Sequence, residues 1–334
     1  MPVLDANQPD HLARAAAALA QGELVAFPTE TVYGLGARAD DARAVAKIFA
    51  AKGRPNDHPL IVHVLDEAAA LHFAQSLPAV AQRLMAAYWP GPLTVIVPRR
   101  AQAASACAAG QSSIGLRCPA HPVARALLAQ AQALGVQGVA APSANRFGHV
   151  SPTTAQHVTS EFDPELLVLD GGPCEVGIES AIVDCSRGFP VLLRPGALAR
   201  SALELAAGEP LRDRDEQAPR ASGTLASHYA PRSRVRLMTT ERLQQAAAQW
   251  AALPASQRQP SALALYSREE WPGGAWNVQR MSSEAAQAAH DLFADLRAMD
   301  AQLQAAGGGE IWVQDPPDDP LWDGVRDRLM RAAA

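Results

Sequence analysis

The stretch that decides the fold is ELVAFPTETVYGLGARADDARAVAKIFAAKGRPNDHPLIVH, residues 23–63. Its apolar run 24–27 predicts a short buried strand, which Pro28 ends because proline removes a backbone donor. Gly34 and Gly36 come after a run of polar side chains, and glycine lets the backbone turn sharply or approach a ligand closely. A strand that leads into hydroxyls and glycines indicates a small-molecule site at the edge of an α/β sheet.

A helix and a basic loop follow this turn. Asp40 or Asp41 can cap the helix and Gly53 can stop it. The cationic and titratable side chains that cluster at its end are Lys52, Arg54, His58 and His63. The same pattern also fits a plain turn and a helix C-terminus complemented by positive charge, so this stretch alone leaves both interpretations open.

Composition limits the classes of protein that the chain can belong to. Its 334 residues suffice for one large or two ordinary domains, and 48% hydrophobic with 19% charged residues predicts a substantial core. A net charge of −5 argues against a general nucleic-acid or membrane binder, although it leaves room for a local basic pocket.

Cysteine usage and the N-terminus favour the cytoplasm. The four cysteines are scattered and form no C-x-x-C pair, so a zinc or redox motif is unsupported and a reducing compartment is favoured. Residues 1–22 lack a signal-peptide pattern, and no window offers the roughly 18 apolar residues of a membrane span.

Alternating strand and helix patterns predict an α/β fold with an open, twisted mixed sheet. Segments 180–186 and 190–196 flank a short turn and should pair as a hairpin, which makes the sheet mixed rather than purely parallel. Ser151 and Pro152 predict a helix start, with the serine as cap and the proline at the first helical position. Further strands are expected at 60–65, 93–98, 114–119, 138–142 and 166–170.

The pattern changes character after a helix at about 197–207. Residues 208–233 are polar, lack apolar periodicity and are interpreted as a linker that ends in His-Tyr-Ala-Pro. We therefore predict a first domain over 1–207, this linker, and a smaller Rossmann-like α/β domain over 234–334. Its expected strands and helices are 235–238, 240–252, 261–267, 283–305, 310–314 and 320–333.

Several polar clusters stand at the predicted strand ends of the first domain. Basic groups that converge in an acidic protein suit a polyanion, and the planar guanidinium matches phosphate oxygens well. Serine and asparagine after a strand also fit simple turns, so the residues by themselves indicate only an anionic-ligand site. No Ser-His-Asp order, phosphate-binding loop motif or metal-ligand spacing is present. The members are Thr29, Thr31, Tyr33, Ser113, Arg117, Ser143, Asn145, Ser180 and Arg194, beside the basic loop.

An ordered series of motifs resembles the YrdC-like family. The motifs are FPTETVYGLG (27–36), KGRPNDHPLIVHV (52–64), GLRCP (115–119), PSAN (142–145), ESAIVD (179–184) and LLRPG (192–196). HYAP (228–231) and the second domain resemble the long, two-domain threonylcarbamoyl-AMP synthases of that family. The resemblance implies a YrdC-like sheet with a concave, positively charged face.

The resemblance also implies an activity. Such a nucleotidyltransferase would form threonylcarbamoyl-adenylate and pyrophosphate from L-threonine, bicarbonate or CO2, and ATP. Other proteins would then transfer the threonylcarbamoyl group to tRNAs that read ANN codons, and direct tRNA binding stays open. Mg2+ is expected with ATP, with no dedicated metal site on the protein. The alternatives are an RNA-binding or ribosome-maturation protein of the same fold, or a paralogue with another carbamoyl substrate.

Site roles follow residue by residue from the same resemblance. Lys52 and Arg54 would be catalytic, because charge grows on the leaving pyrophosphate and cationic stabilisation matters most. Arg117 would pair with the carboxylate of threonine, and Tyr229 would close the site as a lid. The implied ATP contacts are Arg54, His58, Ser143, Asn145, Ser151, Arg194 and Tyr229. The implied threonine contacts are Thr31, His63, Ser113, Arg117, Ala141 and Ser180.

Overall fold

The computed structural model describes residues 3–225, 227–254, 263–271 and 276–334. The chain divides into two compact units, each described by itself below. The first unit comprises Met1–Phe147 and Ser151–Thr224, and the second comprises Gly148–Val150 and Leu225–Ala334. A three-residue piece near the middle of the sequence therefore belongs to the second unit.

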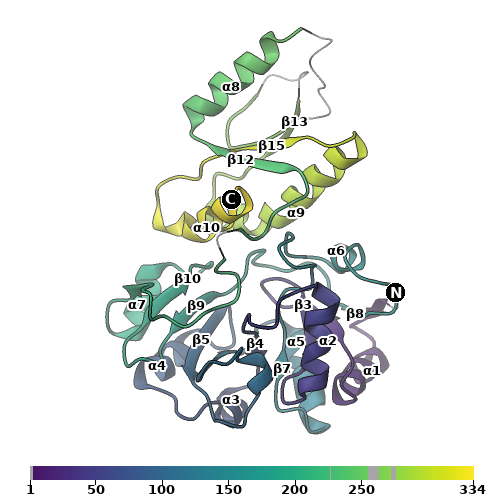
Figure 1. Cartoon of the computed structure of the whole chain (residues 1–334), viewed down its shortest axis with the longest axis vertical. Helices are drawn as coiled ribbons and strands as arrows, with labels where there is room; N and C mark the ends of the chain where they lie inside the picture. Colours follow the sequence, from purple (N-terminus) through teal and green to yellow (C-terminus); the bar gives the residue numbers. More distant parts are fainter. Residues whose placement is uncertain (1–2, 226, 255–262, 272–275) are drawn as a thin grey trace. The chain divides into compact units, whose positions relative to one another are not determined.

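A mixed sheet forms the centre of the first unit (Figure 1). Its strands are β1 (Val3–Asp5), β2 (Val25–Phe27), β3 (Gly34–Arg38), β4 (Ile61–His63), β5 (Leu93–Pro98), β6 (Ser113–Arg117), β7 (Val139–Ala140), β8 (Leu167–Asp170), β9 (Ala181–Asp184), β10 (Val191–Arg194) and β11 (Arg212–Asp213). The order is β1-β8-β2-β3-β7-β4-β6-β5-β9-β10-β11, with β9 and β10 antiparallel as the hairpin pattern predicts. The predicted mixed α/β class is confirmed.

Helices cover the two faces of this sheet unequally. Its helices are α1 (Pro9–Ala20), α2 (Ala42–Lys52), α3 (Glu67–Phe73), α4 (Ala79–Tyr88), the 3-10 helix η1 (Ser105–Cys107), α5 (Pro122–Ala133), α6 (Ala155–Thr159) and α7 (Arg200–Ala207). Residues of α2, α3, α4 and α7 share one apolar core with one face. On the other face, α1 and α5 pack over β2, β7 and β8.

The rest of that second face is covered by a loop. Side chains of β4, β5, β6 and β9 point to this part, which we call the open face because α1 and α5 do not cover it. It includes Ile61, Thr94, Ile96, Gly115 and Ile182. Ala218 and Ala221 pack on Ile96 and Ile182. Residues 218–222, the covering segment, therefore take the place that a helix occupies elsewhere on the sheet.

The predicted turn at Gly34 and Gly36 is wrong. They lie in β3, which pairs antiparallel with β2 and β7. A Cβ at Gly36 would lie 2.8 Å from Cε1 of Phe27 and 2.9 Å from Cγ1 of Val139. Glycine is thus needed for close packing inside the sheet, whereas the sequence pattern suggested a bend.

The predicted helix start at Ser151 and Pro152 is wrong. Helix α6 begins at Ala155, and the side chain of Thr154 caps it by accepting from the backbone N–H of His157. The Ser151 hydroxyl instead donates to the carboxylate of Glu179. A serine that finds a buried carboxylate has a stronger partner than an orphan amide at a helix end.

The second unit is a small parallel α/β domain. Its elements are β12 (Arg234–Met238), α8 (Thr240–Ala252), β13 (Leu263–Ser267), β14 (Asn277–Arg280), α9 (Ala285–Ala305), β15 (Glu310–Gln314), the 3-10 helix η3 (Pro320–Trp322) and α10 (Asp323–Ala332). The strands run parallel in the order β12-β15-β13-β14. Ser261 and Ala262, which begin the predicted strand 261–267, lie outside the described residues.

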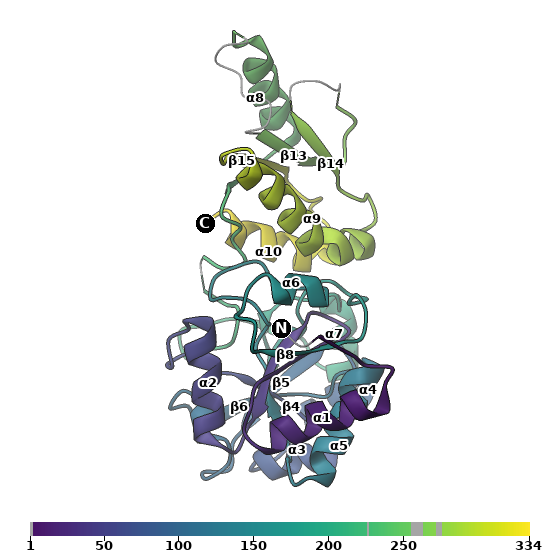
Figure 2. The ribbon, with the colours of Figure 1, turned by 90° about the vertical axis from the view of Figure 1, so that its right-hand side faces the viewer.

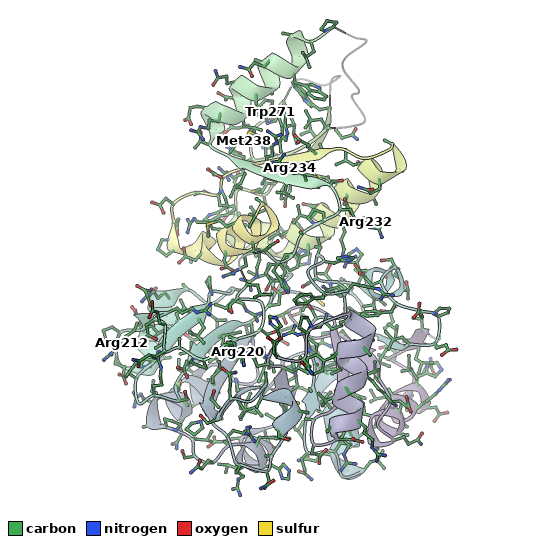
Figure 3. All side chains as sticks on the ribbon, in the orientation of Figure 1. Arg212, Arg220, Arg232, Arg234, Met238 and Trp271 are labelled. Carbon is green, nitrogen blue, oxygen red and sulfur yellow. The ribbon has the colours of Figure 1, made fainter. Side chains whose placement is uncertain are left out.

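Both faces of the small sheet are covered, as in a Rossmann-like fold. Figure 2 shows α8 and α9 on opposite sides of β13 and β15. Leu243 of α8 packs with Leu265 and Trp312, and Met238 and Trp271 (labelled in Figure 3) join this layer. The predicted Rossmann-like second domain is confirmed by this arrangement.

Candidate functional site

Lys52 joins the end of α2 to the PSAN motif. Its ammonium group is buried and donates to the backbone carbonyl of Ser143 at 2.6 Å and to that of Asn145. The carbonyl of Lys52 accepts from the N–H of Phe147 at 2.9 Å. Burial, helped by the charge of Arg54, lowers the pKa of Lys52 well below its usual value. The structure therefore brings together Lys52, Ser143 and Asn145, as the sequence analysis expected of a shared site.

Arg54 and His58 flank the ring of Phe147. The guanidinium carbon of Arg54 lies 5.9 Å from the ring centroid, and the His58 ring lies 5.5 Å from it. Arg54 donates to the carbonyl of Pro59 at 3.0 Å and to the hydroxyl of Ser222 at 3.4 Å. Burial and the charge of Arg54 lower the pKa of His58, so its imidazole is neutral near pH 7.

Arg194, the last residue of β10, contacts the same covering segment. Its Nε and Nη2 donate to the Ser180 carbonyl at 3.1 and 3.0 Å, and Nη1 donates to the Ser222 carbonyl at 2.9 Å. The Ser180 hydroxyl lies 2.8 Å from that of Thr94. Two buried arginines, Arg54 and Arg194, thus converge on Ser222.

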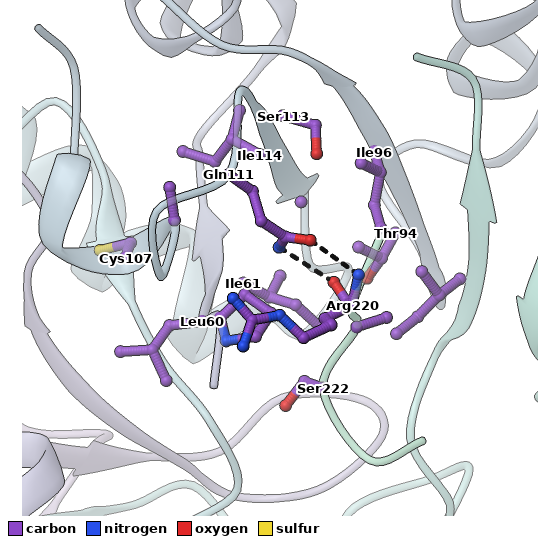
Figure 4. Close-up of a pocket in the computed structure, with 15 residues that line it drawn as sticks. Leu60, Ile61, Thr94, Ile96, Cys107, Gln111, Ser113, Ile114, Arg220 and Ser222 are labelled. Atoms are coloured by element: carbon purple, nitrogen blue, oxygen red, sulfur yellow. Dashed lines mark hydrogen bonds between the residues drawn. The ribbon is translucent and has the colours of Figure 1, made fainter. Parts of the chain in front are cut away.

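The covering segment nearly fills the open face. The Gln111 side chain donates to the Arg220 carbonyl at 3.2 Å and accepts from its N–H at 2.7 Å, as Figure 4 shows. The cavity left between this segment and the sheet has about 20 Å³ of space, enough for one water molecule. Ser113 and Thr94 line it from the sheet side.

A buried ion pair stands at the other end of β6. Nη2 of Arg117 lies 2.6 Å from Oε1 of Glu30, whose Oε2 accepts from the N–H of Ala120 at 3.0 Å. Burial is the largest influence and raises the pKa of Glu30, but the charge and hydrogen bond of Arg117 together with backbone donors hold that pKa below its usual value. Sequence reasoning missed Glu30 as a site residue, although its place between two threonines in FPTET was a signal.

His63 shares the face of Arg117. The two residues are register partners on β4 and β6, and Thr94 pairs with Arg117 from β5. Burial, with the charge of Arg117 second, lowers the pKa of His63 to about 3, which makes its imidazole neutral at pH 7. Nε of Arg117 and Nδ1 of His63 are buried and have no hydrogen-bond partner among the described residues. Two buried polar atoms on this face thus lack a partner within the described part of the chain.

The other predicted threonine contacts include Thr31, Ala141 and Ser113. The Thr31 hydroxyl lies 2.9 Å from that of Thr29. Ala141 is buried in the core beneath α1 and α5. Ser113 opens β6 and Arg117 closes it, a separation of about 13 Å along an extended strand. The structure therefore does not bring Ser113 beside Arg117.

Tyr229 belongs to the second unit. It is buried, has a left-handed φ of 62°, and its ring centroid lies 5.4 Å from that of Phe293.

Within the described ranges, no group of three His, Cys, Asp or Glu side chains is arranged to hold a metal ion. No helix in the described part of the chain is long and apolar enough to cross a bilayer.

Fold and site together define an α/β protein whose candidate site gathers buried cationic side chains. The family model of the Sua5, YciO and YrdC domain, described as telomere recombination, matches residues 17–196, which is more than half of the chain. A second model, the C-terminal domain of threonylcarbamoyl-AMP synthase, matches residues 194–334. The chain belongs to the Sua5–YciO–YrdC family, and the predicted family is confirmed.

Two curated relatives carry the name threonylcarbamoyl-AMP synthase. The chain is 43% identical to threonylcarbamoyl-AMP synthase of Bacillus subtilis over 68% of its own length and 66% of that relative's. Identity to the Pyrococcus abyssi enzyme of the same name is 40%, over 66% of each. These relatives are nucleotidyltransferase-type enzymes, and each alignment spans slightly less than two thirds of the relative.

Solved structures extend the likeness to both units. A double-alanine variant of P. abyssi Sua5 superposes with a TM-score of 0.87 at 30% identity, covering 100% of this chain and 96% of that one. P. abyssi Sua5 in complex with L-threonine gives a TM-score of 0.85 at 32% identity, covering 96% and 94%.

Proposed function

We propose that the chain is an L-threonylcarbamoyladenylate synthase, which joins L-threonine, bicarbonate or CO2, and ATP and releases pyrophosphate. The observation that carries the proposal is the convergence of Arg54 and Arg194 on one residue, Ser222, beside the loop that Lys52 fixes. Two guanidinium groups that converge on one segment present planar sets of donors, and such donors match phosphate oxygens well.

The reaction requires the protein to position the substrates and to stabilise developing charge. A carbamate oxygen of the carboxylated amine attacks the α-phosphorus of ATP, and the bond to the leaving pyrophosphate breaks. Arg54 and Arg194 would stabilise the charge that grows on the leaving group. Lys52 would hold the Ser143 and Asn145 carbonyls so that the loop meets the nucleotide in one shape.

Threonine would bind at the Arg117 end of β6. The carboxylate would take the unpartnered Nε of Arg117, while Glu30 keeps Nη2 and thereby fixes the plane of the guanidinium. Neutral His63 would offer Nδ1 without adding charge. The threonine-bound structure of P. abyssi Sua5 supports a threonine site in this fold.

ATP requires the covering segment to leave the open face. The present space of about 20 Å³ is far below the several hundred Å³ that a nucleotide needs. Mg2+ would enter with ATP as substrate, with the phosphates as its main ligands. Tyr229 would help close the site, and downstream proteins would carry the threonylcarbamoyl group to tRNA.

Pyrophosphate release tests the proposal. ATP is supplied with threonine and bicarbonate, singly and together, and we expect release only when both are present. Replacing threonine by serine then tests the pocket. Release that ignores threonine would overturn the substrate assignment. Salt-dependent RNA binding without ATP turnover would favour the RNA-binding alternative.

A further inference from the structure

A row of paired residues crosses the open face of the first unit. His63 on β4 pairs with Arg117 on β6, which pairs with Thr94 on β5. Thr94 pairs with Ile182 on β9, and Ile182 pairs with Arg194 on β10. Paired residues on neighbouring strands point to the same side of a sheet, and such strands lie about 4.8 Å apart. Thr94 therefore stands between Arg117 and Arg194, in the middle of the row.

The hydroxyl of Thr94 is hydrogen-bonded to that of Ser180, the residue just before β9. The two oxygens lie 2.8 Å apart, and the residues are 0% and 1% exposed. Nη2 of Arg194 donates to the Ser180 oxygen at 3.3 Å. All of these groups belong to the first unit, so its strands alone fix the position of the hydroxyl pair.

The hydroxyl pair holds two protons, and only one of them can lie between its two oxygens. Within the described ranges, the Thr94 hydroxyl makes no other hydrogen bond, and the Ser180 hydroxyl otherwise only accepts from Arg194. The second hydroxyl proton thus has no acceptor in the described part of the chain. Because a buried donor without an acceptor is costly, the pair is suited to an acceptor oxygen of a ligand.

The side chain of Thr94 is held in one orientation. A Cβ added at Gly115 would lie 3.5 Å from Cγ2 of Thr94, so the methyl group points towards that glycine while the hydroxyl meets Ser180. A β-branched side chain has few rotamers, which fixes the hydroxyl oxygen before a ligand arrives. Thr94 also lines the cavity of about 20 Å³ under the covering segment (Figure 4). The pair therefore borders a space that can hold one water-sized group.

We infer that the hydroxyl pair of Thr94 and Ser180 binds the carbonyl oxygen of the carbamate that forms on the threonine amine. The inference rests on the proposed function, which places the threonine carboxylate at Arg117 and phosphate at Arg194. The carbamate connects these two anionic groups in the reacting molecule, and Thr94 stands between the two arginines. A neutral hydroxyl donor stabilises the carbonyl oxygen and leaves the other carbamate oxygen to attack phosphorus.

Thr94→Val tests the inference in the full chain. Valine keeps the branched shape of the side chain and removes the hydroxyl. With ATP and threonine saturating, we expect the KM for bicarbonate in pyrophosphate release to rise about tenfold, the effect of one lost hydrogen bond to a charged group. The KM for ATP should stay unchanged, because Arg54 and Arg194 keep their other contacts. Thr94→Ser, which keeps the hydroxyl, should recover most of the affinity.

Thr159→Val is the matched control. Thr159 is the last residue of α6, and its hydroxyl donates to the Gln156 carbonyl at 2.9 Å. This variant loses a hydroxyl in the same way but away from the open face, so its KM for bicarbonate should equal that of the unmodified chain. If Thr94→Val does not fold, Ser180→Ala removes the other hydroxyl of the pair and should raise the same KM.

Three results would overturn the inference and leave the proposed function intact. The first is an unchanged KM for bicarbonate in Thr94→Val. The second is a rise in the KM for threonine alone, which would assign the hydroxyl pair to the side chain of threonine. The third is an equal rise in all three KM values together with a lower Tm, which marks a purely structural role. An unmodified chain that releases no pyrophosphate with all three substrates overturns the proposed function, and the inference with it.

Discussion

At the scale of single residues, burial decides the charge state of the site. His63 is neutral because its ring is buried beside Arg117, and Glu30 stays ionised because Arg117 and backbone donors together overcome its burial. Arg117 therefore lowers the pKa of both groups, which favours a neutral imidazole and an ionised carboxylate. The ion pair holds Arg117 in place without using its Nε.

Arg54→Ala should abolish adenylate formation. Loss of one preorganised donor to developing charge costs about 3 kcal/mol, or a rate loss of at least ~100-fold. Steady-state pyrophosphate release measures the rate, and near-ultraviolet circular dichroism checks the fold. Arg43→Ala, an exposed arginine on α2, should keep normal turnover. Near-normal release by Arg54→Ala would contradict its phosphate role.

Glu30→Gln should unfold more easily without threonine than with it. The substitution leaves Arg117 buried and uncompensated, which costs about 3 kcal/mol of unfolding free energy. If threonine places its carboxylate on Arg117, saturating threonine returns a counter-charge and raises the Tm of Glu30→Gln more than that of the unmodified chain. Equal increases in Tm would speak against this binding mode.

His63 should weaken the fold in acid. Its native pKa of about 3 lies below the unfolded value near 6.5, so only the unfolded chain binds this proton between those pH values. The contribution of His63 to the free energy of unfolding is complete above pH 6.5 and is smaller by about 2.5 kcal/mol at pH 4.5. Urea unfolding of His63→Gln at pH 7 and 4.5 should show a smaller acid loss by that amount. An identical loss of unfolding free energy in His63→Gln and in the unmodified chain would refute the lowered pKa of His63.

Residue types were the easiest part of the site to predict, and pairings were the hardest. Lys52 and the PSAN motif were expected to share a site, and the structure joins them directly. Glu30 was not predicted as a site residue because its partner Arg117 lies 87 residues further along the chain. No local spacing encodes a pair of that kind.

At the scale of elements, the site exists because α1 and α5 cover only part of one sheet face. The strands β4, β5, β6 and β9 present isoleucines there together with Gly115 and Thr94. Which face would lie open depends on where the helices pack, and this is a tertiary property.

Gly36→Ala should test the tight packing of β3. A Cβ at 2.8–2.9 Å from Phe27 and Val139 forces the neighbours apart and should cost about 1–3 kcal/mol of unfolding free energy. Urea unfolding measures this cost. Gly115→Ala is the control, because its Cβ would meet Thr94 at an ordinary 3.5 Å. A loss no larger in Gly36→Ala than in the control would refute the packing argument.

At the scale of the whole molecule, the polar stretch after the first domain does more than connect. Interpreted from sequence as a linker without regular structure, it contributes β11 and the covering segment to the first unit and Tyr229 to the second. Its composition gave no sign of this, because its contacts are mainly hydrogen bonds to distant backbone rather than a periodic apolar face. The predicted boundaries at 207 and 234 remain predictions.

The most direct measurement of the central claim is the mass of the product. The chain is incubated with ATP, threonine and carbon-13 bicarbonate, and the nucleotides are analysed at once by mass spectrometry. We expect an adenylate that contains threonine and carries the isotope label, together with pyrophosphate. AMP or ADP alone, or an adenylate without the label, would contradict it.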